Sequence, residues 1–416
     1  MSYVAPPLDV MRRVGWGFIS LYALASMSTS LLFLAPALVT LPLKVNALVG
    51  ADHAANSLAL VTGIGAVVSL FANPFFGRMS DRTSSALGMR RPWMVIGVIG
   101  GSLGILVVAL APNIAAVLVG WCIAQLMFNA LLAAQIAVLP DQIPTDQRGQ
   151  VGGILGVCLP IAAVTATFLV QLVAGNQLAM FLVPCAVGGT CILAFVLTLK
   201  DRRLELACKP RWSLREFLNT FYVNPRANPD FAWAFASRFM LVLAYAFLVT
   251  FQTYYLIEHL GTAEDDVPRQ VFLGTVVQSL VLIAASLTAG PLSDTIGRRK
   301  IFVVSASIVY GIALFLIAVA SNFDAFLVGM AISGLGFGMY TAVDLALVVD
   351  VLPNPDSSAK DLGVLNIAGA FPFAVAPAVA PAILAISDGS YGVLYAVAGV
   401  CALAGAAAIL PIKTVR

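Results

Sequence analysis

Long apolar runs with almost no charge, separated by short polar loops, dominate this sequence of 416 residues. A helix needs roughly 20 apolar residues to cross the hydrocarbon core of a bilayer, and these runs reach that length. Sixty per cent of the residues are hydrophobic and 10% are charged, with a mean hydropathy of +0.96, a composition typical of membrane proteins. The runs are too long for membrane strands and do not alternate. We therefore expect an all-α integral membrane protein.

Run length sets the expected helices, because segments that are apolar on every side carry no helical period. We expect twelve spans, six in each half of the chain. The first six are 14–41, 58–76, 94–111, 114–139, 151–174 and 178–199, and the last six are 231–257, 271–291, 301–320, 325–352, 362–386 and 391–410. The expected domains are a six-helix bundle at 1–199, a cytoplasmic linker at 200–230 and a second six-helix bundle at 231–416.

Basic residues predict the orientation, because cytoplasmic loops carry an excess of Lys and Arg. With both termini inside, 21 of the 23 basic residues fall on the cytoplasmic side, which leaves Lys44 and Arg269 outside. The net charge of +3 is thus a topology signal, and we expect no contact with nucleic acid. The six cysteines show no disulfide or zinc spacing, and there is no Asn-x-Ser/Thr acceptor. A multi-pass protein of a prokaryotic inner membrane fits these features.

One polar loop occurs twice. Gly-Arg-Met-Ser-Asp-Arg begins at Gly77 and is followed by Gly-Met-Arg-Arg-Pro-Trp from Gly88. Gly-Pro-Leu-Ser-Asp begins at Gly290, 213 residues after Gly77, and closes with Arg-Arg-Lys. A Leu-Pro pair at Leu139 recurs at Leu352 with the same offset of 213 residues. The two halves of the chain are therefore expected to repeat one fold.

The doubled Gly-x-x-x-Asp loop with its downstream basic pair resembles the loop signature of the major facilitator superfamily of transporters. The Gly-Met-Arg-Arg-Pro-Trp extension at 88–93 resembles the glycoside and sucrose-type cation symporter branch of that superfamily. The resemblance implies two six-helix bundles related by an axis along the membrane normal, with the substrate site between them near the midplane. Transport would then rock one bundle against the other.

The resemblance also implies a cytoplasmic gate built from the two loops. Its predicted residues are Gly77, Asp81, Arg82, Arg90, Arg91, Gly290, Asp294, Arg298 and Arg299. Asp81 and Asp294, held by close helix contacts that the glycines permit, are expected to form charge networks with the arginines only while the inside is closed. Thr295 replaces the usual basic residue after Asp294, so the second network is expected to be weaker. The alternative is that the arginines only hold the topology.

Asp344 lies inside the tenth expected span, whereas the other acidic residues lie in loops or at helix ends. An ionisable side chain within a span costs roughly 2.5–3.5 kcal/mol on insertion scales, so it needs a partner and usually has a function. Arg238 in the seventh span is the candidate partner, because both residues lie about 10–12 Å inside the cytoplasmic boundary at about 1.5 Å per residue. Protonation would loosen the pair and couple a proton to rocking. A static salt bridge is the alternative.

The resemblance implies that the first, fourth, seventh and tenth spans line the cavity. Polar and aromatic residues on these spans are predicted to bind substrate. They are Tyr22, Ser26, Trp121, Gln125, Asn129, Tyr245, Gln252, Tyr255, Phe337 and Thr341. Amides beside aromatic rings suit a polyhydroxylated ligand, because hydroxyls need paired donors and acceptors while the apolar face of a sugar packs on rings. Helix packing is the competing use of the same residues.

The sequence carries no phosphate-binding loop, so we expect a secondary carrier rather than an ATP-driven pump. It also shows no nucleophile and base pairing or metal cluster, and an enzyme is not expected. The prediction is a monomeric proton symporter of a small polar solute, most simply a sugar or glycoside, with the proton as coupling ion and no cofactor. A drug or metabolite exporter, a uniporter and a non-transporting sensor with the same fold are the alternatives.

Overall fold

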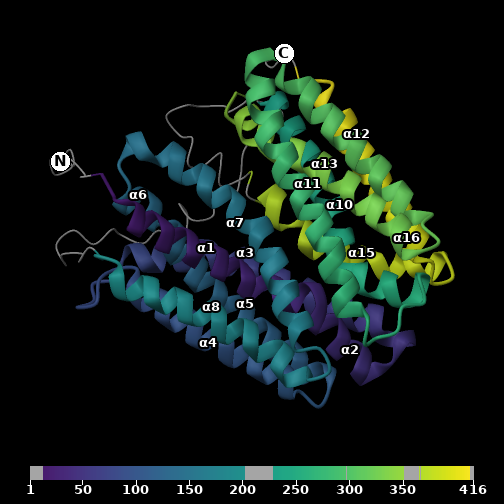
Figure 1. The fold of residues 1–416 in the computed structure, drawn as a ribbon, viewed down its shortest axis with the longest axis horizontal. Coiled ribbons are helices and arrows are strands. Elements are labelled where there is room, and N and C mark those ends of the chain that lie inside the picture. Colours follow the sequence, from purple (N-terminus) through teal and green to yellow (C-terminus); the bar gives the residue numbers. More distant parts are fainter. Residues whose placement is uncertain (1–12, 202–227, 297, 351–364, 366, 413–416) are drawn as a thin grey trace.

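The computed structural model describes residues 13–201, 228–296, 298–350, 365 and 367–412, without the side chains of Thr145, Asp294 and 345–350. In this part of the chain all regular structure is helical (Figure 1). Twelve helical segments are long and apolar enough to cross a membrane. The predicted all-α fold with twelve spans is therefore confirmed.

The helices form two groups. The N-terminal half comprises α1 (Trp16–Ala35), the π-helical turn η1 (Pro36–Thr40), α2 (Leu41–Val49), α3 (Ala51–Asp81), α4 (Arg91–Leu110), α5 (Ile114–Ile136), α6 (Val138–Gln142), α7 (Thr145–Leu172) and α8 (Gln177–Thr198). The C-terminal half comprises α10 (Pro229–Tyr254), the π-helical turn η3 (Tyr255–His259), α11 (Val267–Ile296), α12 (Arg299–Ala318), α13 (Phe323–Asp350), α15 (Pro372–Ile386) and α16 (Tyr391–Ile409).

The first two spans are longer than run length predicts. Helix α2 continues to Val49 and α3 begins at Ala51, so that Gly50, with φ +73°, is the break between them. Hydropathy assigns this stretch to a loop because of its polar residues, but helical backbone hydrogen bonds do not depend on side-chain polarity. Lys44 accordingly lies on α2, where its Nζ donates to the Ala109 carbonyl at 3.0 Å.

Within each half, glycines let neighbouring helices approach closely. A Cβ on Gly104 of α4 would lie 2.6 Å from the Ala124 nitrogen of α5, and a Cβ on Gly336 of α13 would lie 2.6 Å from the Tyr310 nitrogen of α12. Close packing of small residues holds membrane helices together where lipid leaves little hydrophobic driving force. Each half is thus packed internally through close helix contacts, and the division into two bundles at the predicted boundaries stays a prediction.

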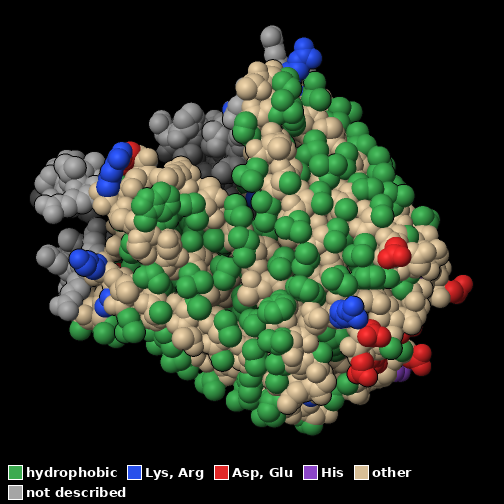
Figure 2. Space-filling model, in the orientation of Figure 1, with side chains coloured by type: hydrophobic (Ala, Val, Ile, Leu, Met, Phe, Trp, Pro, Cys, Tyr) green, Lys and Arg blue, Asp and Glu red, His purple; other side chains and the backbone are tan. Residues whose placement is uncertain are grey.

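Figure 1 shows the two bundles as the arms of a V that meet near α2 and α15. The first and last described residues lie at the separated ends, which we call the inner end because the basic residues predict a cytoplasmic location for it. Figure 2 shows a largely apolar surface along the helices, with acidic side chains gathered at the opposite, outer end. The orientation itself stays a prediction.

Contacts between the halves involve α3 with α15 and α7 with α11. The cross-half hydrogen bonds between described residues lie at the outer end: Thr253 Oγ1 donates to the Leu38 carbonyl at 2.8 Å, and the Tyr254 hydroxyl donates to the Pro42 carbonyl at 3.0 Å. Asn46 of α2 also donates to Glu264 Oε1, at 2.5 Å. The two halves are thus joined at the outer end, which with the predicted orientation corresponds to an inward-facing state.

The α3 and α15 contact provides a site for a covalent lock. A Cβ on Gly63 would lie 3.9 Å from the Cβ of Pro377, inside the range of about 3.5–4.5 Å that disulfides require. In a background without native cysteines, Gly63→Cys with Pro377→Cys should cross-link on oxidation, as measured by mass spectrometry of peptides. Gly63→Cys with Val379→Cys is the control, because Val379 is 42% exposed. Equal cross-linking in both pairs would contradict this packing.

Candidate functional site

Arg238 of α10 and Asp344 of α13 form an ion pair inside the C-terminal bundle. The distance from Arg238 Nη1 to Asp344 Oδ2 is 2.9 Å, and the two side chains are 22% and 13% exposed. Arg238 lies nine residues after the start of α10 and Asp344 six residues before the end of α13, so both lie about 9–14 Å from the inner ends of their helices. The structure thus brings together the two residues that the sequence proposed as partners.

The pair leaves one donor of the guanidinium without a partner. Arg238 Nε is buried and forms no hydrogen bond with a described residue. A Cβ on Gly369 would lie 3.7 Å from Arg238 Nη2, so the guanidinium also lies against the segment that leads into α15. Arginine stays protonated in proteins, so loss of the Asp344 charge would leave an uncompensated cation between three helices. Any change in Asp344 therefore acts on the packing of α10.

An aromatic layer lies on the same two helices as the ion pair. Tyr245 of α10 stacks on Phe337 of α13, with ring centroids 4.3 Å apart and ring planes at 13°. Phe373 of α15 meets Tyr245 edge-on at 6.2 Å and 84°. Tyr245 and Phe337 are both half-buried, so the stack keeps accessible ring surface. Stacked rings can bind an apolar or aromatic ligand face.

The ion pair and the ring stack belong to the same two helix faces. Tyr245 follows Arg238 by seven residues, and Phe337 precedes Asp344 by seven. Seven residues are two helical turns, or about 10 Å, and return to the same face. Because α10 and α13 run in opposite directions, both steps lead from the inner end towards the middle of the membrane. The two helices therefore present a charged layer and, two turns deeper, an aromatic one.

The structure separates the predicted substrate residues into two groups. Those with accessible surface are half-buried Ser26, Gln125, Tyr245 and Phe337, and exposed Thr341. Buried ones are Tyr22, Trp121, Asn129, Gln252 and Tyr255. For the residues with accessible surface, a role in substrate binding stays a prediction.

The buried group mostly serves helix packing in this conformation. Asn129 Nδ2 donates to Ser69 Oγ of α3 at 2.9 Å, and Trp121 lies over Gly65 of the same helix. The Tyr22 hydroxyl donates to the Gln135 carbonyl at 3.0 Å. Trp121 and Asn129 of the expected inward-facing stripe on α5 therefore face α3 instead, because helical spacing gives a face but not its direction.

Tyr255 and Gln252 lie towards the outer end of the C-terminal bundle. The Tyr255 hydroxyl donates to the Ile317 carbonyl at 2.6 Å, and its ring packs against Phe326 and Tyr395. This places Tyr255 inside its own bundle rather than facing the other half. Gln252 is 4% exposed and precedes the cross-half contact at Thr253. The cavity prediction for Tyr255 is not supported by this geometry.

In the first polar loop, Arg90 connects three helix ends of the N-terminal half. Arg90 Nη1 lies 2.6 Å from Asp81 Oδ1, and its Nε lies 2.8 Å from Asp141 Oδ2 on α6. The same guanidinium donates to Ser80 Oγ. Burial alone would lower the pKa of Arg90, but hydrogen bonds and charges from Asp141 and Asp81 outweigh it and raise that pKa. Arg90 therefore stays charged.

The expectation that this network exists only while the inside is closed is wrong for Arg90. Its acidic partners Asp81 and Asp141 belong to its own half, so the contacts persist in an inward-facing structure. The close helix contact expected at Gly77 is also missing, because no atom of another described helix lies within 4 Å of the position of its Cβ. Arg82 Nη1 and Arg91 Nε are buried without a hydrogen bond to a described residue.

The second polar loop is described in part. Asp294 belongs to α11, but its side chain lies outside the described residues. Gly290 makes an ordinary contact, with its Cβ position 3.9 Å from the Ala342 Cβ of α13. Arg298 is exposed and precedes α12, which Arg299 begins. The gate role of this loop stays a prediction.

The sequence did not indicate the role of Asp201. Asp201 Oδ2 accepts hydrogen bonds from the backbone nitrogens of Arg90 and Arg91, at 2.6 and 2.8 Å, and so caps the start of α4 from the end of α8. Gly88 is needed beside it, because its φ is +103° and a Cβ there would lie 2.3 Å from Asp201 Oδ2. No spacing rule links residues 113 positions apart, so the pairing appears only in three dimensions.

Removal of this cap should destabilise the N-terminal bundle. Asp201→Ala should lower the stability by about 1 kcal/mol, as loss of a helix cap does. Gly88→Ala should cost more, because of both its backbone conformation and the clash with Asp201. The double variant should cost less than the sum, because the clash disappears with the carboxylate. Thermal unfolding of the purified variants in detergent measures this; strictly additive losses would contradict the contact.

The sequence model of the Major Facilitator Superfamily matches residues 17–273 and 263–415. Multidrug resistance protein MdtG of Salmonella choleraesuis (strain SC-B67) is 26% identical over 277 residues, which are 64% of this chain and 64% of that protein. MdtG of Klebsiella pneumoniae (strain 342) is also 26% identical over 277 residues, covering 64% and 63%. The matched stretch thus spans less than two thirds of these relatives.

Solved structures share the fold at low sequence identity. The nucleoside transporter NupG superposes with a TM-score of 0.73 at 13% identity, over 95% of this chain and 98% of that one. A D-xylose-proton symporter gives 0.70 at 14% identity, over 95% and 97%. The human organic anion transporter MFSD10 gives 0.68 at 15% identity, over 97% and 100%. With the family model matching almost the whole chain, the protein belongs to the Major Facilitator Superfamily of transporters.

Proposed function

We propose that this protein is a secondary active transporter that couples the movement of a small organic solute to protons. The observation that carries the proposal is the Arg238 and Asp344 ion pair, held within the spans of the C-terminal half at 2.9 Å. Charged residues inside membrane segments commonly mark ion or substrate pathways. An aspartate is the member of this pair that can take up a proton.

Protonation of Asp344 would remove the charge that holds Arg238 against α13. The guanidinium would then need other acceptors, and α10 would no longer be fixed to α13 at this level. The partial exposure of both side chains in the inward-facing state gives a proton access from the inner end. A change in charge at this one position thereby biases the balance between two arrangements of the bundles, which is the requirement for coupling.

A sugar or glycoside is the first candidate solute, from the resemblance of the loop at 88–93 to that symporter branch. The stacked rings of Tyr245 and Phe337 suit the apolar face of a sugar ring. The accessible polar side chains of Ser26, Gln125 and Thr341 can serve its hydroxyls. In this form the protein works as a proton symporter.

Export of a drug or metabolite is the second candidate. It is favoured by the relatives named as multidrug resistance proteins and by the engagement of polar groups in helix packing. The side chains of Asn129 and Tyr22 form hydrogen bonds with other helices. The cavity wall therefore offers fewer hydrogen-bonding partners for the hydroxyls of a sugar. An amphipathic solute that stacks on the rings would need fewer such partners.

The proposal is tested in proteoliposomes with labelled sugars, glycosides and a fluorescent lipophilic cation, with and without a proton gradient. Wild type should accumulate its solute only with the gradient, whereas Asp344→Asn should lose accumulation but keep solute counterflow, because a neutral side chain mimics the protonated state. Asp324→Asn is the matched control, since Asp324 is exposed at the outer start of the same helix. Gradient-driven accumulation by Asp344→Asn would contradict the coupling role.

Removal of one partner from a buried ion pair can cost about 3–5 kcal/mol, so Asp344→Asn could unfold. The double variant Arg238→Gln with Asp344→Asn removes both charges and should recover stability without recovering accumulation. Movement of sugars would support the symporter, and extrusion of the lipophilic cation the exporter. Transport of any solute that ignores the proton gradient in wild type would contradict proton coupling itself.

A further inference from the structure

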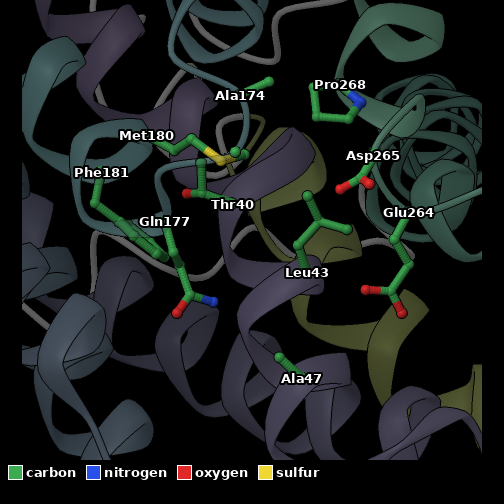
Figure 3. A pocket seen from close by; sticks show the side chains of 11 residues that line it. Thr40, Leu43, Ala47, Ala174, Gln177, Met180, Phe181, Glu264, Asp265 and Pro268 are labelled. Carbon is green, nitrogen blue, oxygen red and sulfur yellow. The ribbon is translucent and has the colours of Figure 1, made fainter.

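A pocket of about 170 Å³ lies between the two halves at the outer end. Its walls come from η1 and α2, from the turn between α7 and α8 with the first residues of α8, and from the segment that leads into α11 with the start of that helix. Figure 3 shows Glu264 and Asp265 on one side, Met180, Phe181 and Gln177 on the other, and Thr40 between them. The site is distinct from the ion pair, which lies near the inner end.

Two exposed acidic side chains, Glu264 and Asp265, line the pocket. Glu264 accepts a hydrogen bond from Asn46, and Asp265 forms no ion pair with a described residue. The basic residues predicted at this end do not neutralise them: Lys44 donates to the Ala109 carbonyl, and Arg269 does not line the pocket or form an ion pair with a described residue. A cation entering the pocket therefore meets two carboxylates.

A second feature points to a ligand. Thr40 is 2% exposed, and its hydroxyl is buried without a hydrogen bond to a described residue. A buried hydroxyl without a hydrogen-bonding partner destabilises a protein. Figure 3 shows this side chain between the two walls, with its oxygen towards Phe181 and Gln177 rather than towards Glu264 and Asp265. A ligand with a hydroxyl or an N–H group would satisfy it.

We propose that this pocket binds a small organic ammonium ion and that the bound ion holds the outer end closed. Carboxylates on one wall match the positive charge, and Met180 and Phe181 on the other match the ion's carbon atoms. Glu264 and Asp265 belong to the C-terminal half, whereas Thr40 and Phe181 belong to the N-terminal half. The complete site exists only while the halves meet here.

A ligand that binds one conformation shifts the equilibrium towards that conformation by its difference in affinity. An ammonium ion in this pocket would thus stabilise the inward-facing state and slow transport without competing for the substrate site. The acidic outer surface visible in Figure 2 would raise the local concentration of cations. The pocket would act as an inhibitory site.

The probe is labelled choline, with the neutral isostere 3,3-dimethylbutan-1-ol as competitor, on the purified full chain in nanodiscs. Choline should bind saturably and the alcohol should compete poorly. Asp265→Asn should weaken choline binding about tenfold, as expected for a lost charge contact. Asp266→Asn is the matched control, because this neighbouring acid is exposed but does not line the pocket. Thr40→Val should weaken choline binding more than it weakens tetramethylammonium binding.

State dependence is tested with the Gly63→Cys and Pro377→Cys pair. Oxidation, which holds the outer end closed, should preserve or tighten choline binding. With the lock oxidised, Asp344→Asn should leave choline binding intact, because the outer end is then held closed whatever the charge at Asp344; this separates the pocket from the ion pair. The proposal is wrong if choline does not bind, if the alcohol competes equally, if Asp265→Asn binds like Asp266→Asn, or if the oxidised lock abolishes binding.

Discussion

The hydrocarbon core of a membrane offers no hydrogen-bonding partner, so every backbone group and every charge must be satisfied by the protein itself. This constraint explains why the described chain is helical and why its charges gather at the helix ends. Within the spans it leaves two solutions for an ionisable group: a carbonyl, as for Lys44 and Ala109, or an opposite charge, as for Arg238 and Asp344. The second solution can be switched by a proton.

Helix α10 connects the features that alternating access requires. Near its inner end it carries Arg238, two turns later Tyr245 of the ring stack, and near its outer end Thr253 and Tyr254, which donate to carbonyls of the other half. A shift of α10 that follows loss of the ion pair would therefore move both the aromatic layer and the residues that hydrogen-bond to the other half at the outer end. The glycine-packed bundles on either side supply the rigidity that carries such a shift.

Much of the fold followed from the sequence, because run length decides membrane spans whatever their packing. The partnership of Arg238 with Asp344 was also predictable, since two charges at equal depth have strong reason to pair. The direction in which a helix face points could not be predicted. Helical spacing placed Trp121 and Asn129 on one face of α5, but only the structure shows that this face contacts Gly65 and Ser69 of α3. Asp201 was missed because its partners are backbone nitrogens far away in sequence.

The central claim is that protonation of Asp344 controls the arrangement of the two bundles. Spin labels at Leu197 and Leu410, which are 82% and 61% exposed near the inner ends of α8 and α16, report the separation of the halves by pulsed electron paramagnetic resonance. In wild type the distance distribution should change as the pH falls, whereas Asp344→Asn should show the low-pH distribution at every pH. If Asp344→Asn kept the pH dependence of wild type, the proton would act elsewhere and the account would be wrong.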